Sequence, residues 1–331
     1  MNRLPPLQSA LLRAAGTLAS RHGPGSLLVL IYHRVLPTRD PLLPDEPDAT
    51  DFSAQMDLIG GNFRVLPLTE AVQRLQSGDL PARSVSITFD DGYANNCEVA
   101  LPILKSRGIP ATVFVASGFL SGGRMFNDTV IEAVRHAPEE LDLTREGLGR
   151  HVLPDIASRV RAIAAILPEL KYLPQPERLR RAAAVAERVG AELPDDLMMT
   201  EDQVRRLHRE GIDIGAHTVN HPILANADEF TARREIVESK VRLEEMIGAR
   251  VSAFAYPNGN PTRDYTIRDV TLAREAGFEV AVSTAWGAAT PGRDPLQIPR
   301  IAPWDRAALR FGLRMVRAYA ERELQLAQRE G

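Results

Sequence analysis

The sequence predicts an α/β fold in which strands and helices alternate around a mostly parallel sheet, either open or closed into a barrel. Short apolar runs recur along the chain, and their length and β-branched content favour strands. Amphipathic stretches of helical length separate them, which is typical of parallel sheets. The expected strands are Leu27–Tyr32, Ser84–Phe89, Ala111–Ala116, Ile212–Ala216, Val251–Ala255 and Phe278–Ser283.

Several of the intervening stretches carry signals that begin, end or bend a helix. Thr200 with Gln203 three residues later forms a capping-box pattern, and Gly211 ends that helix. Pro102 is expected to kink a second one. The expected helices are Asp51–Gly60, Thr69–Ser77, Ala94–Arg107, Thr200–Gly211, Ala227–Ile247 and Thr266–Ala276.

The predicted barrel spans residues 27–304 and is flanked by a helical segment at each end, residues 1–26 and 305–331. Within 305–331, the stretch Arg306–Gln328 reads as an amphipathic helix that packs on the barrel. Residues 128–199 break the strand–helix rhythm, show no convincing strand and predict a helical insertion. A spacer is favoured for this insertion over a substrate-selecting lid.

The composition is that of a soluble globular protein, with 44% hydrophobic and 25% charged residues in 331. A formal net charge of −3 gives no indication of nucleic-acid binding. Cys97 is the single cysteine, so no intramolecular disulfide forms. No clear signal peptide or membrane-spanning run is seen, and a cytoplasmic location is expected. Contact of the amphipathic ends with a membrane surface is an alternative to their packing on the barrel.

Polar residues of functional type directly follow four of the expected strands. They are His33, the Asp90–Asp91 pair, His217 and the Tyr256–Pro257 pair. In a parallel barrel the carboxyl ends of the strands converge on one face, where active sites form. We therefore expect these residues to share one site.

Two histidines four residues apart, His217 and His221, and one carboxylate of the Asp90–Asp91 pair would make a set of three metal ligands. Such a set leaves positions on a divalent metal for water and substrate. The metal activates its bound water, and the second carboxylate can accept the proton. Taken alone, the Asp90–Asp91 pair is more often part of a turn, and the His217 and His221 pair is more often a coincidence. Because both motifs occur at strand ends, a metal site is favoured.

Three segments stand out as possible signatures: Thr88–Tyr93 (TFDDGY), His217–Pro222 (HTVNHP) and Phe254–Gly259 (FAYPNG). They resemble the signatures of the polysaccharide deacetylase family, also called the NodB-homology or carbohydrate esterase family 4 group. The resemblance covers roughly residues 27–301 apart from the insertion. It implies a distorted (β/α) barrel and metal-dependent hydrolysis of an N-acetyl group on a sugar.

The resemblance also implies roles for individual residues. Asp90 would be the catalytic base, and the backbone N–H of Tyr93 would stabilise the oxyanion. The metal ligands would be Asp91, His217 and His221. The metal is expected to be Zn²⁺, with Co²⁺, Ni²⁺ or Fe²⁺ as alternatives. Tyr256 and Pro257 would line the substrate groove.

The chain departs from the common family pattern at the residues that orient the base and supply the acid. The third signature lacks its usual Arg, and Arg300 could reach in from a later strand to orient the base or to contact the substrate. No histidine follows His221, so the usual late acid is absent. The segment Ile31–Arg34 resembles the early motif of the poly-N-acetylglucosamine deacetylase subgroup, which makes His33 the expected acid. Trp286 is a candidate pocket residue or a core residue.

The expected function is removal of the N-acetyl group, as acetate, from an amino sugar in a polysaccharide such as an exopolysaccharide, an oligosaccharide or a lipid-linked glycan. One alternative is hydrolysis of another carbohydrate-linked amide, such as a formamido sugar. Another is a barrel that binds glycans without catalysis, although a pure binder would not need Asp90. The residues leave open the natural glycan, the oligomeric state and any protein partner.

Overall fold

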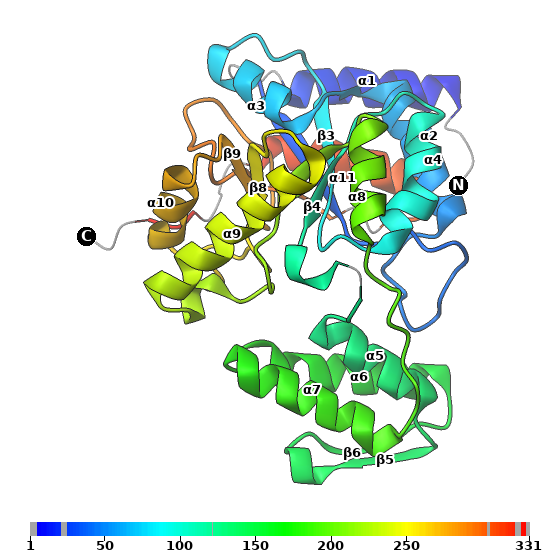
Figure 1. Ribbon diagram of the computed structural model, residues 1–331. Helices are drawn as coiled ribbons and strands as arrows, with labels where there is room; N and C mark the ends of the chain where they lie inside the picture. The colour runs from blue at the N-terminus through cyan, green and yellow to red at the C-terminus, as the bar shows by residue number, and fades with distance from the viewer. Residues whose placement is uncertain (1–4, 21–24, 121, 303–304, 322–325, 329–331) are drawn as a thin grey trace. The chain divides into compact units, whose positions relative to one another are not determined.

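The computed structural model describes residues 5–20, 25–120, 122–302, 305–321 and 326–328 (Figure 1). The chain forms two compact units. One comprises Met1–Thr38, Asp45–Leu120 and Met199–Gly331, and the other comprises Arg39–Pro44 and Ser121–Met198. Each unit has its own hydrophobic core. The expected terminal segments, 1–26 and 305–331, extend in part beyond the described residues.

The first unit is built on a parallel sheet that curls into a distorted barrel surrounded by helices (Figure 1). The strand order is β1-β3-β4-β7-β8-β9, and β2 pairs with the start of β3. All six expected strands are present, which confirms the predicted fold class. The strands are β1 (Leu27–Tyr32), β2 (Arg64–Val65), β3 (Ser84–Phe89), β4 (Thr112–Val115), β7 (Asp213–Ala216), β8 (Ala253–Ala255) and β9 (Val280–Val282).

A short segment after β9 connects the two edges of this sheet. Ile298 pairs in parallel with Val282 of β9, and Ile301 pairs in parallel with Leu30 of β1. Backbone hydrogen bonds run both ways: Ser283 N–H donates to Ile298 and Ile31 N–H to Ile301, while Ile298 N–H donates to Ala281 and Ile301 N–H to Val29. The segment between them therefore lies where another barrel strand would, and this position carries Arg300 into the barrel.

The helices predicted around the sheet are present, and their end signals work as expected. Thr200 and Gln203 cap each other at the start of α8. Pro102 lies at the start of α4, directly after a π-helical turn. These helices and turns are α2 (Ala49–Asn62), α3 (Leu68–Ser77), η1 (Asn96–Ala100), α4 (Leu101–Lys105), η2 (Ser117–Phe119), α8 (Glu201–Arg209), η4 (Leu224–Asn226), α9 (Glu229–Ile247) and α10 (Ile267–Glu275).

The terminal helices α1 (Pro6–Ser20) and α11 (Ala308–Ala320) pack against each other. A Cβ on Gly312 would lie 2.6 Å from the Leu12 side chain, so glycine permits this close approach. The prediction that the last helix reaches Gln328 was wrong, because residues 326–328 are not helical. Instead the Ala327 backbone N–H donates to the Gln297 side chain at 2.8 Å, and the Gln297 side chain donates to the Ala327 carbonyl at 3.2 Å. Both backbone groups of Ala327 are therefore bonded to this side chain and not within a helix.

The second unit combines three helices, α5 (Phe126–His136), α6 (Ile156–Lys171) and α7 (Gln175–Val189), with an antiparallel hairpin. The hairpin strands β5 (Glu140–Leu143) and β6 (Gly149–Val152) contradict the expectation that residues 128–199 hold no strand. The turn η3 (Thr144–Glu146) joins the strands. Leu141 and Leu143 alternate with exposed acidic residues and pack into the core of this unit, an alternation too short to detect in a helix-rich stretch.

Candidate metal and catalytic centre

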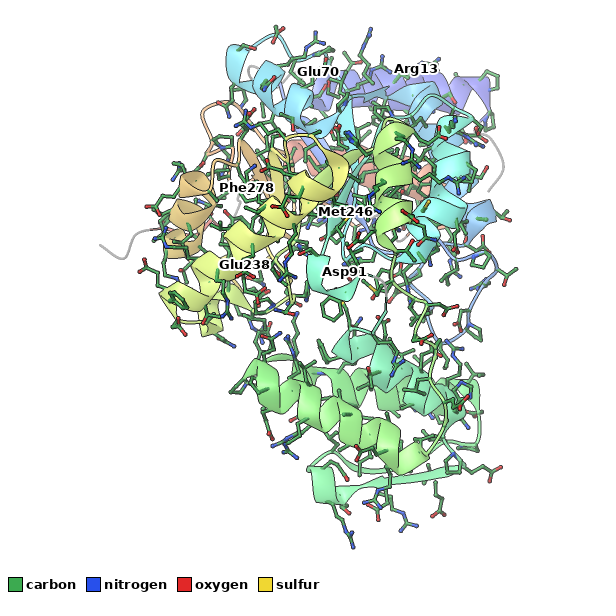
Figure 2. The ribbon with its side chains drawn as sticks, viewed as in Figure 1. Arg13, Glu70, Asp91, Glu238, Met246 and Phe278 are labelled. Atoms are coloured by element: carbon green, nitrogen blue, oxygen red, sulfur yellow. The ribbon has the colours of Figure 1, made fainter. Side chains whose placement is uncertain are left out.

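The predicted site residues meet where the barrel strands end. Asp90 and Asp91 follow β3, His217 follows β7, and His33 follows β1. Figure 2 marks Asp91 at this end of the sheet. Because all these strands run parallel, their carboxyl ends bring residues that are far apart in sequence onto one face.

Asp91, His217 and His221 present one ligand atom each within 4.8 Å of one another. The Nε2 atoms of both histidines lie 3.4 Å from the Asp91 Oδ1 atom. Ligands placed about 2.0–2.1 Å from a tetrahedral metal are separated by about 3.4 Å. The two imidazoles and one carboxylate therefore fit a divalent metal such as zinc both in chemistry and in spacing.

Hydrogen bonds orient the two histidines. The Nδ1 atom of His217 lies 2.7 Å from the carbonyl oxygen of Ala255, which can only accept, so the other ring nitrogen faces Asp91. The backbone N–H of His221 donates to the Thr218 hydroxyl at 3.1 Å. Asp91, Thr218 and His221 all have positive φ, at 75°, 63° and 51°. Such backbone strain gathers at functional sites.

Glu235 on α9 supports the loop between the histidines, and no sequence motif marks it. Its buried carboxylate accepts hydrogen bonds from the Val219 and Asn220 N–H groups at 2.9 and 2.8 Å, and from the Asn220 side chain at 2.7 Å. Charge-assisted bonds of this kind hold a loop firmly. Glu235 thus sets the path of the chain from His217 to His221.

The charges in the site favour the ionised form of Asp91. Burial alone would raise the pKa of Asp91, but the hydrogen bond from His217 and the positive charges of His221 and His33 hold it well below its usual value. Burial lowers the pKa of His217, whereas Asp91 and Asp90 raise it above its ordinary value. Two anionic carboxylates beside the imidazoles make an environment that attracts a cation.

Asp90 is paired with Arg300, which the sequence suggested only weakly. Both oxygens of Asp90 accept from the Arg300 guanidinium at 2.6 Å, and both side chains are almost fully buried. Arg300 also donates to the Thr88 hydroxyl and the Ser283 carbonyl. Burial would raise the pKa of Asp90, but Arg300 and His217 lower it below its ordinary value. The carboxylate is therefore held ionised and in one orientation.

His33 lies beside these carboxylates and borders an open pocket of about 390 Å³, which Asp45, Glu46 and Ala302 also line. Its positive form would lower the pKa values of Asp90 and Asp91. Glu46 went undetected in the sequence, because it lies in a loop without periodicity. Burial raises the pKa of Glu46, partly offset by His33 and by the hydrogen bond from the Arg34 N–H.

The remaining expected site residues are wholly or partly buried. Tyr256 and Pro257 are buried, and the Tyr256 ring stacks on Tyr265 at 4.0 Å while its hydroxyl donates to Leu296. Tyr256 therefore packs into the core and does not line a substrate groove, which corrects the expectation for this residue. Arg300 is also buried and contacts Asp90 in place of a sugar. Trp286 is half-buried against the main core, with Arg317 6.0 Å from its ring. Tyr93 is buried, with the Arg34 guanidinium 4.1 Å from its ring.

Comparison with known proteins agrees with this geometry. The family model described as polysaccharide deacetylase matches residues 77–169 and 177–281. The curated Bacillus subtilis (strain 168) protein named "Putative polysaccharide deacetylase YxkH" is 22% identical over 284 residues, covering 85% of this chain and 73% of that protein.

Two solved structures share the fold. The Streptococcus pyogenes deacetylase PplD, in complex with acetate, superposes with a TM-score of 0.60 and 20% identity over 89% of this chain and 99% of that one. IcaB from Ammonifex degensii gives a TM-score of 0.57 and 19% identity over 89% and 97%. Both likenesses show the fold.

The family match spans more than half of the chain, and the chain therefore belongs to the polysaccharide deacetylase family. It is a hydrolase of the amide bond of N-acetyl groups on glycans. Members of the family are generally metal-dependent, and the Asp91–His217–His221 set supplies a matching group of ligands.

Proposed function

We propose that this chain removes acetyl groups from an N-acetylated amino sugar of a glycan with one zinc ion held by Asp91, His217 and His221. The observation that carries the proposal is the convergence of these three donors beside Asp90, a carboxylate that Arg300 holds ionised. When bound, the ion supplies Lewis-acid activation of water and of the amide carbonyl. Co²⁺, Ni²⁺ or Fe²⁺ would be held by the same donors.

The remaining steps belong to the residues around the ligands. Asp90 accepts a proton from the attacking water, and Arg300 keeps the carboxylate aimed at it. The backbone N–H of Tyr93 donates to the oxyanion that forms on the amide carbonyl. His33 donates a proton to the leaving nitrogen as the C–N bond breaks. The products are acetate and a free amino sugar.

The pocket beside His33 supports a glycan as substrate, because it is open and lined by polar groups as well as by Ile31 and Pro47. Polymeric, oligosaccharide and lipid-linked glycans share the acetamide. The other parts of the substrate therefore determine which of these glycans is used. A formamido sugar is the alternative substrate, since it would undergo the same chemistry at the same residues.

Acetate release from N-acetylglucosamine oligomers tests the proposal. We expect release with added Zn²⁺ and its loss on chelation. Asp90→Asn should lower kcat by about 10²–10⁴-fold, while bound zinc, measured by elemental analysis, stays stoichiometric. His217→Ala should lose the zinc itself.

The matched control is His208→Ala, which changes a histidine on α8 outside the ligand set. It should keep both zinc and activity. Full activity of Asp90→Asn would refute the assignment of the base, and formate release from a formamido sugar without acetate release would favour the alternative substrate.

A further inference from the structure

Helix α1 exposes a continuous apolar face. Leu7, Leu11 and Leu18 are 72%, 62% and 66% exposed. Their spacings of four and seven residues place them on one side of the helix. The exposed residues beside them are Ala10, Ala14 and Ala15. The other side of α1 carries its buried residues, Leu12, Gly16 and Ser20. The helix is thus held to the barrel by one side and exposes leucines on the opposite side.

Helix α11, which packs against α1, adds to the exposed apolar surface. Leu309 and Leu313 are 41% and 53% exposed and lie one turn apart. Arg310 and Arg317 are exposed on the same helix. Exposed leucines next to arginines are the composition of helices that lie in a membrane interface. Among the described residues, no helix combines the length and apolar content to cross a bilayer.

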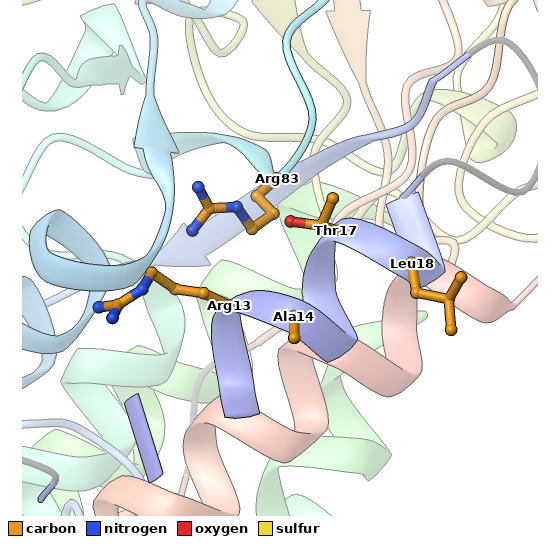
Figure 3. Close-up of a pocket in the computed structure, with 5 residues that line it drawn as sticks. All are labelled: Arg13, Ala14, Thr17, Leu18 and Arg83. Carbon is orange, nitrogen blue, oxygen red and sulfur yellow. The ribbon is translucent and has the colours of Figure 1, made fainter. Parts of the chain in front are cut away.

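Arginines gather on one flank of α1, at a pocket that Leu18 also borders. Arg13 and Arg83 line a shallow pocket of about 440 Å³ together with Ala14, Thr17 and Leu18 (Figure 3). Burial and the positive charges of Arg64 and Arg13 lower the pKa of Arg83, so each of these two arginines repels Arg83. Within the described part of the chain, no carboxylate forms an ion pair with any of them. This local positive charge contrasts with the chain's net charge of −3.

A second exposed apolar stripe, on α9, differs in composition. Phe230 and Val241 are 75% and 44% exposed. Helical spacing places Arg234 and Glu238 on the same side as these residues. That side alternates apolar groups with charges of both signs, whereas the α1 face has no charge among its leucines. The α9 stripe is therefore a natural control.

We propose that the α1 face, with Leu309, Leu313 and the arginines Arg13, Arg64 and Arg83, docks on the surface of an anionic phospholipid bilayer. The leucines would enter the boundary between headgroups and acyl chains, and the arginines would contact lipid phosphates. A second copy of the chain would cover the leucines but leave the repelling arginines without anions. The lipid surface satisfies both features, which favours it over self-association.

Vesicle flotation of the full-length chain tests this binding without reference to catalysis, so its outcome is independent of the proposed function. We expect the protein to float with phosphatidylcholine vesicles that contain phosphatidylglycerol, and much less with phosphatidylcholine alone or in high salt. Arg13→Gln with Arg64→Gln should weaken partitioning about 30-fold. Leu11→Asp with Leu18→Asp should abolish flotation while acetate release from soluble oligomers stays unchanged.

The matched control is Phe230→Ser with Val241→Ser on α9, which should float like the wild type. Circular dichroism verifies that every variant is folded, and light scattering gives its oligomeric state. The proposal is overturned if the wild type does not float, if the α9 control loses binding equally, or if the wild type is a dimer that Leu11→Asp with Leu18→Asp separates.

Discussion

Burial of Asp90 and Arg300 removes two charges from water, and their mutual pairing compensates for that loss. The bidentate contact at 2.6 Å satisfies both carboxylate oxygens, and Thr88 and Ser283 accept further bonds from the guanidinium. Such a pair adds little net stability compared with apolar residues, but breaking it leaves an unpaired buried charge. The pair therefore maintains the orientation and ionisation of the carboxylate.

Arg300→Met should destabilise the protein by about 3–5 kcal/mol, because Asp90 would remain buried without its partner. Urea unfolding measures this loss, and acetate release should fall with it. The double variant Asp90→Asn with Arg300→Met is the control. It should recover much of the stability without recovering activity, because no buried charge is then left without a partner. Equal destabilisation of the single and double variants would contradict this role of the pair.

Glu46 should make stability depend on pH. Its folded pKa is raised by burial above the usual value of 4.5. The folded state therefore binds the proton more tightly, and this contribution to stability, complete below pH 4.5, is lost as the pH rises through the raised pKa. Glu46→Gln, which resembles the neutral form, should raise Tm relative to the wild type at neutral pH.

At pH 4 the melting curves of Glu46→Gln and wild type should coincide. Asp45→Asn, which changes the exposed neighbour, is the control and should alter Tm little at either pH. If Glu46→Gln lowers Tm at neutral pH, the ionised carboxylate is stabilising and the argument from burial fails.

At the scale of elements, η2 and the loop between His217 and His221 approach each other through a glycine. Gly118 donates its N–H to the Val219 carbonyl at 2.8 Å, and a Cβ there would lie 2.6 Å from that oxygen. Any side chain at this position must push the loop that carries the metal ligands. Glycine is required here by close approach alone.

Gly118→Ala should weaken zinc affinity by roughly 10–100-fold, the usual effect of disturbing the support of metal ligands. Titration with zinc against a competing chelator measures the change. Gly61→Ala in α2 is the control, because a Cβ there meets nothing within 4 Å. That variant should bind zinc normally and be slightly more stable. Unchanged affinity in Gly118→Ala would mean that the loop adapts freely.

At the scale of the whole molecule, each unit has a hydrophobic core of its own. Leu170 of α6 is fully buried in the core of the second unit, and Leu243 of α9 is fully buried in the core of the barrel. A leucine-to-alanine change in either core should cost about 2–5 kcal/mol. Because the cores share no residue, we expect each change to act on its own unit.

Hydrogen exchange followed by mass spectrometry tests this expectation in Leu170→Ala and Leu243→Ala. The first variant should speed exchange of peptides within residues 126–189, and the second should speed exchange of peptides from the barrel strands and helices. Each variant is the control for the other. Uniform acceleration across both units in either variant would show that they unfold as one.

The sequence by itself determined the six main barrel strands and the set Asp91, His217 and His221, because their signals are local. Apolar runs of strand length mark the strands, and ligands placed directly at strand ends must converge once the strands are parallel. Only the tertiary structure decided the surroundings of that set. Arg300 lies 210 residues from Asp90 in the chain, and its contact depends on how the segment after β9 joins the two edges of the sheet. Tyr256 follows a strand like the ligands do, yet it points into the core, because position in sequence does not determine where a side chain packs.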